Sequence, residues 1–84
     1  MNRFIEHIIN DLVRDTRINY EKERIYFPYP THPVYPSTLS IHSIVLLIPT
    51  FTDYCKDTYG LTEEEIDYVW DQYKSTIKDK ITNR

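Results

Sequence analysis

The sequence predicts an all-α fold, a small bundle of three or four helices with an extended arm rich in Pro and Tyr between the first and second helices. Two segments, 2–19 and 38–59, repeat apolar residues at steps of three and four, as a helix with one buried face does. A third observation is a pair of adjacent signals, Gly60 to end one helix and Thr62 to begin the next. Because the chain has 84 residues, we expect a single domain over residues 1–84.

The first helix is predicted over residues 2–19. Asn2 can cap its N-terminus, and polar residues separate the apolar ones. The apolar face would consist of Phe4, Ile5, Ile8, Ile9, Leu12 and Val13. Charged residues crowd the stretch from Arg14 to Arg24, which we expect to be a solvated turn.

Residues 25–37 form the predicted arm. Its four Pro residues exclude a helix, because Pro fixes φ and disfavours the α region at the preceding residue. In the polyproline II conformation, residues three apart share an edge and lie about 9 Å from one another. If every X-Pro bond is trans, one edge carries four ring side chains, those of Tyr26, Tyr29, His32 and Tyr35.

These ring side chains have three alternative roles. The arm can lie across the helices of its own chain and supply the apolar area that so small a domain needs. The rings, with the spacing of Pro30, Pro33 and Pro36, also suit a protein partner or a second copy of the chain. Alternatively, the rings stack on nucleobases, with Arg17 or Arg24 nearby to bind phosphate.

Residues 38–59 predict either one helix kinked at Pro49 or two helices, the second beginning near Pro49. Ser37 or Thr38 can cap the start of this region. The residues at helical spacing are Ile41, Ile44, Val45, Ile48, Phe51 and Cys55. Because β-branched residues are frequent here, a buried strand over residues 40–48 is the alternative.

The strongest local signal is the corner at residues 59–66. Gly60 occupies the position where a left-handed residue ends a helix, and Thr62 with Glu65 forms the capping box of the next one. That last helix is predicted over residues 63–81. Its apolar stripe consists of Ile66, Val69, Tyr73, Ile77 and Ile81.

The net charge of −3 argues against nucleic-acid binding, because proteins of that class usually present a basic face. The helices on either side of Gly60 have the order of a helix-turn-helix motif. In such a motif, however, three carboxylates would face the phosphates, those of Glu63, Glu64 and Glu65. A helix-turn-helix protein that binds DNA is therefore only our second alternative.

No combination of residues indicates catalysis, a metal or a cofactor. Cys55 is the single cysteine, which excludes an intramolecular disulfide and a zinc site built from cysteines. A calcium loop beginning at Asp53 would have Thr58 where the turn needs Gly. The histidines also lack the spacing of metal ligands; they are His7, His32 and His42. We predict no cofactor, no metal site and no enzyme activity.

The composition, with no Ala and eleven Ile, indicates an AT-rich genome and suits a phage or another virus. The longest apolar run, residues 44–49, is far shorter than the ~20 residues that span a bilayer. Glu6 and Asp11 interrupt the apolar pattern of residues 1–13, which argues against a signal peptide. We expect the host cytoplasm or the virion as the location, without secretion through a signal peptide and without a transmembrane segment.

These observations favour a non-catalytic protein–protein interaction module. It would be a phage or viral accessory factor that binds a host or virion protein or associates with itself. The alternative is a small protein that binds a nucleotide or a single strand through the aromatic arm. In each case the predicted contacts are Tyr26, Tyr29, His32 and Tyr35.

Overall fold

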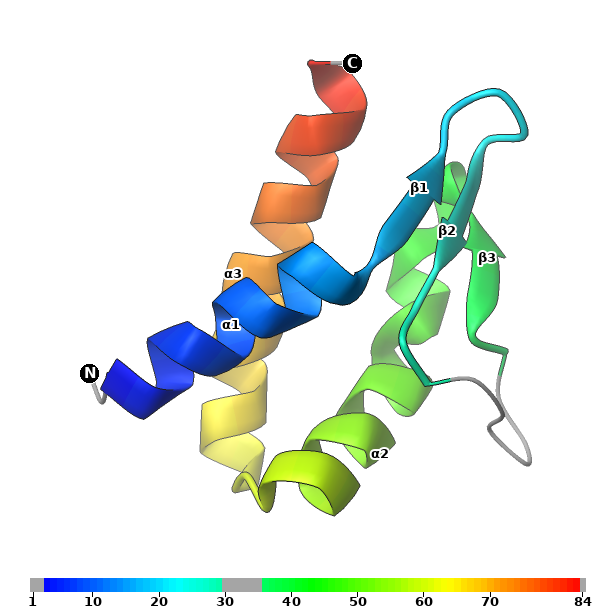
Figure 1. Cartoon of the computed structure of the whole chain (residues 1–84). Helices are drawn as coiled ribbons and strands as arrows, with labels where there is room; N and C mark the ends of the chain where they lie inside the picture. The colour runs from blue at the N-terminus through cyan, green and yellow to red at the C-terminus, as the bar shows by residue number, and fades with distance from the viewer. Residues whose placement is uncertain (1–2, 30–35, 84) are drawn as a thin grey trace.

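The computed structural model describes residues 3–29 and 36–83 (Figure 1). Within these residues the fold is mixed, with three α-helices, one 3₁₀-helix and a three-stranded antiparallel sheet in the order β1-β2-β3. The prediction of an all-α fold is therefore wrong. The elements are, in chain order, α1 (Arg3–Asp15), β1 (Arg17–Asn19), β2 (Arg24–Tyr26), β3 (Thr38–Ser40), η1 (Ile41–Leu47), α2 (Ile48–Tyr59) and α3 (Glu63–Thr82).

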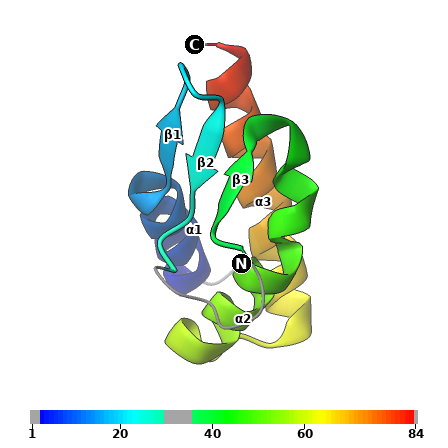
Figure 2. The same ribbon diagram turned by 90° about the vertical axis from the view of Figure 1, so that its right-hand side faces the viewer.

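The helices and the sheet form two layers. Helix α1 packs across α3, and the sheet stands to one side of this pair (Figure 1). Seen after a quarter turn, the strands lie in front of α1 and α3, while η1 lies beside β3 and α2 lies below the sheet (Figure 2). One face of the sheet thus covers the core, and the opposite face points away from the helices.

The sheet lies where we expected a solvated turn and the start of the arm. Apolar and polar residues alternate along the first two strands, so that Ile18 and Ile25 point to one face while Arg17 and Tyr26 point to the other. Leu39 of β3 pairs with Ile25, and both side chains are buried. The predicted polyproline arm over 25–37 is therefore corrected at its start, since Ile25 and Tyr26 belong to a strand.

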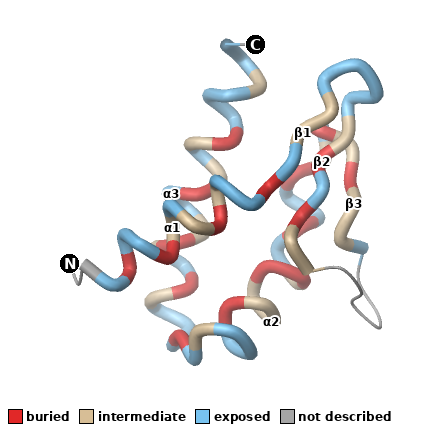
Figure 3. The backbone as a smooth tube through the Cα atoms, viewed as in Figure 1, coloured by how far each residue is buried: buried red, intermediate tan, exposed pale blue. Residues whose placement is uncertain are grey.

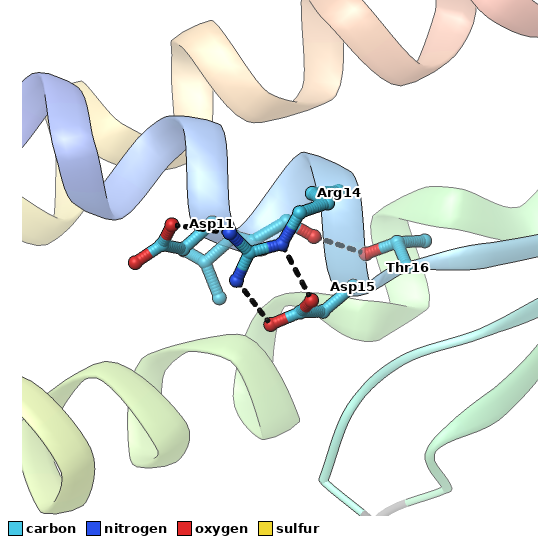
Figure 4. A network of polar contacts seen from close by, with 5 residues as sticks. Asp11, Arg14, Asp15 and Thr16 are labelled. Carbon is cyan, nitrogen blue, oxygen red and sulfur yellow. Dashed lines mark hydrogen bonds and ion pairs between the residues drawn. The ribbon is translucent and has the colours of Figure 1, made fainter.

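Helix α1 ends at Asp15, four residues before the predicted end at 19. The Thr16 hydroxyl donates a hydrogen bond to the Leu12 carbonyl at 2.7 Å and the Thr16 amide donates to the same oxygen at 3.1 Å (Figure 4). Thr16 is buried, and the chain leaves it directly into β1. On the outer side of the same turn, Arg14 pairs with Asp11 and Asp15, but these exposed ion pairs contribute little to stability.

The region predicted as one kinked helix or two helices begins with a strand, β3, and continues as η1 and α2. Pro49 lies in the first turn of α2, where its missing N–H costs nothing. The alternative strand over 40–48 is wrong apart from Ser40. The backbone of η1 departs from helical φ and ψ at Ser43, so η1 consists of two 3₁₀ turns joined by a kink. Its buried residues are three apart in the sequence, as in a 3₁₀-helix: Ile41, Ile44 and Leu47.

The corner between α2 and α3 has the predicted form. Gly60 has a φ of 64°, and the amides of Gly60 and Leu61 donate to the carbonyls of Lys56 and Cys55. Thr62 and Glu65 form a reciprocal capping box at 2.9 and 3.2 Å. These local bonds end one helix and begin the next within three residues.

Tyr73 lies at the centre of the core and has no exposed surface. Its ring contacts those of Phe27, Phe51 and Trp70, with centroid distances of 6.0, 4.9 and 5.9 Å. Its hydroxyl lies 2.8 Å from Thr16 Oγ1. Because the single Thr16 hydroxyl hydrogen is donated to Leu12, the Tyr73 hydroxyl is the donor of this bond. Burial raises the pKa of Tyr73, so this proton is retained.

Removal of the Thr16 hydroxyl tests this bond. We expect Thr16→Val to lower the free energy of unfolding by about 1 to 3 kcal/mol, because it leaves the buried Tyr73 hydroxyl without an acceptor. The double variant with Tyr73→Phe should lose less than the sum of the two single losses, as urea denaturation can measure. Thr76→Val is the matched control, since Thr76 makes the same bond to a carbonyl four residues earlier at an exposed position. Additive losses would contradict the assigned bond.

The left-handed conformation of Gly60 gives a second test. A Cβ at this position would meet no atom within 4 Å, so any cost of Gly60→Ala is conformational. We expect a loss of about 1 kcal/mol in the free energy of unfolding. Gly60→Asn should lose less, because Asn tolerates this backbone region. Equal losses in the two variants, measured by thermal unfolding, would contradict this explanation.

Candidate functional site

The structure gives the predicted ring residues different surroundings. Tyr26 lies on β2 with its side chain on the outer face of the sheet, and Tyr29 lies beside α2. His32 and Tyr35 lie outside the described residues. Of the four ring residues that we predicted on one edge, the structure therefore describes only Tyr26 and Tyr29.

Tyr29 packs against its own chain. Its ring centroid lies 5.5 Å from that of Tyr54, and its hydroxyl donates to Asp57 Oδ2 at 3.4 Å. Loss of hydration raises the pKa of Tyr29, and the nearby Asp57 charge adds to this effect. Phe27, which also belongs to the predicted arm, is buried between Phe51, Tyr54 and Tyr73. Residues 27–29 of the arm therefore pack against the helices of their own chain, which is the first of the three roles that the sequence left open.

The outer face of the sheet brings two arginines to an exposed ring. Arg17 pairs across the strands with Tyr26, and Asn19 pairs with Arg24. All four side chains share one face, because residues two apart on a strand point the same way. We call this group the Arg–Tyr face. A hollow of about 500 Å³ lies beside β1, lined by Arg17, Ile18, Asn19 and Tyr26. Among the described residues, Arg24 does not line it.

A second surface is formed by aliphatic side chains. Val45, Leu46 and Ile48 are 60%, 59% and 39% exposed, although their neighbours Ile44 and Leu47 are buried. We call these three residues the aliphatic ridge. The sequence did not predict this ridge, because α-helical spacing places Val45 and Ile48 with the core residues, whereas the kinked 3₁₀ segment before α2 buries Leu47 instead.

The segment that contains the aliphatic ridge lacks formal charges. No Asp, Glu, Lys or Arg occurs between Arg24 and Asp53, although such residues make up 27% of the chain. His42 is the only titratable side chain of η1, and its Nε2 lies 2.9 Å from Glu23 Oε2. The ridge therefore presents an apolar surface with no charge from its own segment.

Other chemical groups do not assemble into a centre within the described residues. Cys55 is completely buried, and burial raises the pKa of its thiol to about 12, which makes it a poor nucleophile. Across residues 3–29 and 36–83, no group of three or more His, Cys, Asp or Glu side chains is placed to hold a metal ion. None of the helices in this part of the chain has both the length and the apolar character needed to cross a membrane.

Comparisons with known proteins add no assignment to this geometry. No protein-family model, curated protein or solved structure matches the chain. The Arg–Tyr face and the aliphatic ridge are therefore judged on their own chemistry.

The Cys55 thiol predicts how stability depends on pH. Its pKa is about 12 in the folded protein and 9.0 as the ordinary value, so the unfolded chain loses the proton first as pH rises. This contribution to stability is complete below pH 9 and is lost as pH increases from 9 toward 12. Between pH 8 and 10.5, we expect the free energy of unfolding of the wild type to fall by about 1 to 2 kcal/mol more than that of Cys55→Ala. Urea denaturation under reducing conditions measures both values. Tyr73 is present in both proteins, so an equal fall in both would contradict the role of Cys55.

Proposed function

We propose that the protein is a non-catalytic interaction module that forms a symmetric dimer through the aliphatic ridge. The observation that carries this proposal is the exposure of Val45, Leu46 and Ile48 side by side in η1 and the start of α2. Burial of such side chains is favourable by about 25 cal/mol per Å² of apolar area removed from water.

The lack of charge around the ridge supports a second copy of the chain as the partner. In an interface with twofold symmetry, a residue near the axis meets its own copy, so a charged residue there would meet a like charge. Segment 25–52 has no Asp, Glu, Lys or Arg to create this repulsion. Two copies of this surface can thus face each other without repulsion between formal charges of this segment.

The small size of the ridge limits the strength of the dimer. A stable protein interface usually takes about 20 residues from each partner. Three aliphatic side chains therefore favour a weak dimer that depends on protein concentration. A chain of 84 residues also buries only a modest core, so that additional burial in a dimer would stabilise it.

Substitution of the ridge tests this proposal. The wild type should reach twice the monomer mass between micromolar and millimolar concentration in sedimentation equilibrium. Val45→Ser with Leu46→Ser should remain monomeric, because the double variant removes apolar area that the partner would cover. Both positions are exposed, so the helical circular dichroism should not change.

Phe4→Ser is the matched control, since Phe4 is 54% exposed on α1, away from the ridge. This variant should dimerise as the wild type does. A wild type that stays monomeric throughout, or a ridge variant that dimerises with wild-type affinity, would overturn the proposal.

The other functional hypotheses stay predictions. They are an accessory role in a phage or virus, a host or virion protein as partner, and contacts through Tyr26, Tyr29, His32 and Tyr35. Binding of DNA through the corner at Gly60 has no further observation in its favour.

A further inference from the structure

We propose that the Arg–Tyr face binds a mononucleotide, with the Tyr26 ring stacked on the base and the Arg17 guanidinium group on the phosphate. This site is separate from the aliphatic ridge, because the ridge belongs to η1 and α2 and the Arg–Tyr face to β1 and β2. The two proposals can therefore succeed or fail independently.

The sheet fixes the positions of these side chains. Ile18 and Ile25 form the middle pair of the β1–β2 ladder; Ile25 is buried in the core and Ile18 is half-buried against it, so the flanking residues must point outward. Tyr26 is directly opposite Arg17, and Arg24 precedes Tyr26 by two residues on the same strand. Arg17 therefore lies beside the Tyr26 ring without any change in the backbone.

The Tyr26 ring is available for stacking. It is 36% exposed, and no other ring of the described residues packs against it, whereas Phe27 and Tyr29 on either side of Pro28 both have ring partners. An exposed aromatic face on a strand binds a planar base by stacking. Tyr26 is the one exposed tyrosine among the residues lining this hollow.

The Arg17 guanidinium group can bind a phosphate. Arg17 is exposed, and the described part of the chain gives it no carboxylate partner. Arg24 is half-buried and donates through Nη2 to the Thr38 carbonyl at 3.2 Å, which ties its guanidinium to β3, on the opposite side of β2 from Arg17. Planar guanidinium groups bind phosphate oxygens through paired hydrogen bonds.

The hollow has the size of a small-molecule site. Its volume is about 500 Å³, and typical ligand pockets measure about 300 to 1,000 Å³. Residues along β1 are exposed or half-buried, whereas a buried residue interrupts β2 (Figure 3).

The surrounding charges favour a single nucleotide over a long strand. Asp15, Glu21 and Glu23 lie next to β1 and β2 in the chain, and the net charge is −3. A strand that runs beyond Arg17 would meet these carboxylates. Affinity for a longer polyanion requires further phosphate contacts.

Binding of AMP to the full chain tests the site by calorimetry and thermal shift. AMP should bind and raise the melting temperature. Adenosine, which lacks the phosphate, and ribose 5-phosphate, which lacks the base, should each bind about tenfold more weakly. Equal binding of inorganic phosphate and AMP would overturn the assignment of the base to Tyr26, and absence of AMP binding would overturn the site.

Variants then test each contact. Arg17→Gln and Tyr26→Ser should each weaken AMP binding by about tenfold, whereas Tyr26→Phe should keep it, because stacking needs the ring and not the hydroxyl. Lys22→Gln is the matched control, a nearby cation in the hairpin turn, and should change binding by less than about twofold. Variants are compared at equal helical content, and equal effects of Lys22→Gln and Arg17→Gln would contradict a specific phosphate contact.

Two further measurements separate the possible ligands and the two proposals. An octanucleotide of deoxyadenosine should bind no more tightly than AMP. A much higher affinity that falls steeply with salt would instead identify a single-strand site and overturn the mononucleotide assignment. The variant with Val45→Ser and Leu46→Ser should bind AMP as the wild type does, and loss of binding there would show that the site needs the dimer.

Discussion

The side chain of Tyr73 is completely buried, and its ring and hydroxyl contact residues that lie far apart in the sequence. Its ring meets Phe27 beyond β2 and Phe51 in α2, and its hydroxyl meets Thr16 between α1 and β1. A smaller residue at this point would leave a cavity where α3 now contacts Phe27 and Phe51. The positions of both candidate surfaces depend on this packing, because each lies on the outside of an element whose inner side faces Tyr73 or its neighbours.

The same burial explains which side chains are exposed. Ile25 and Leu39 face the core, and the pleat of the strands therefore turns Arg17, Arg24 and Tyr26 outward. Ile44 and Leu47 face the core, and the threefold repeat of η1 therefore leaves Val45 and Leu46 in solvent. One surface is cationic and aromatic, and the other is aliphatic, yet both arise from the fixed periodicity of a short element.

An element could be predicted from the sequence when its signal lies within residues that are close together in the chain. The capping box of Thr62 and Glu65 needs four residues, and the stripe of α3 repeats over about four turns, so both could be predicted. A strand of three residues buries a single side chain, and the partners Ile25 and Leu39 are separated by the loop, so no local pattern reveals the sheet. Tyr26, Arg17 and Arg24 were recognised as possible contacts, but only the antiparallel register brings them together.

The packing of α1 against α3 also has a kinetic consequence. Thr16 and Tyr73, which join the two helices, are 57 residues apart in the chain. A ribosome adds about 5 to 20 residues per second, so the apolar face of α1 waits roughly 3 to 11 s for its partner to be made. During synthesis Ile5, Ile8 and Leu12 are therefore exposed to water or to a chaperone, and the newly made chain is most prone to aggregation in this interval.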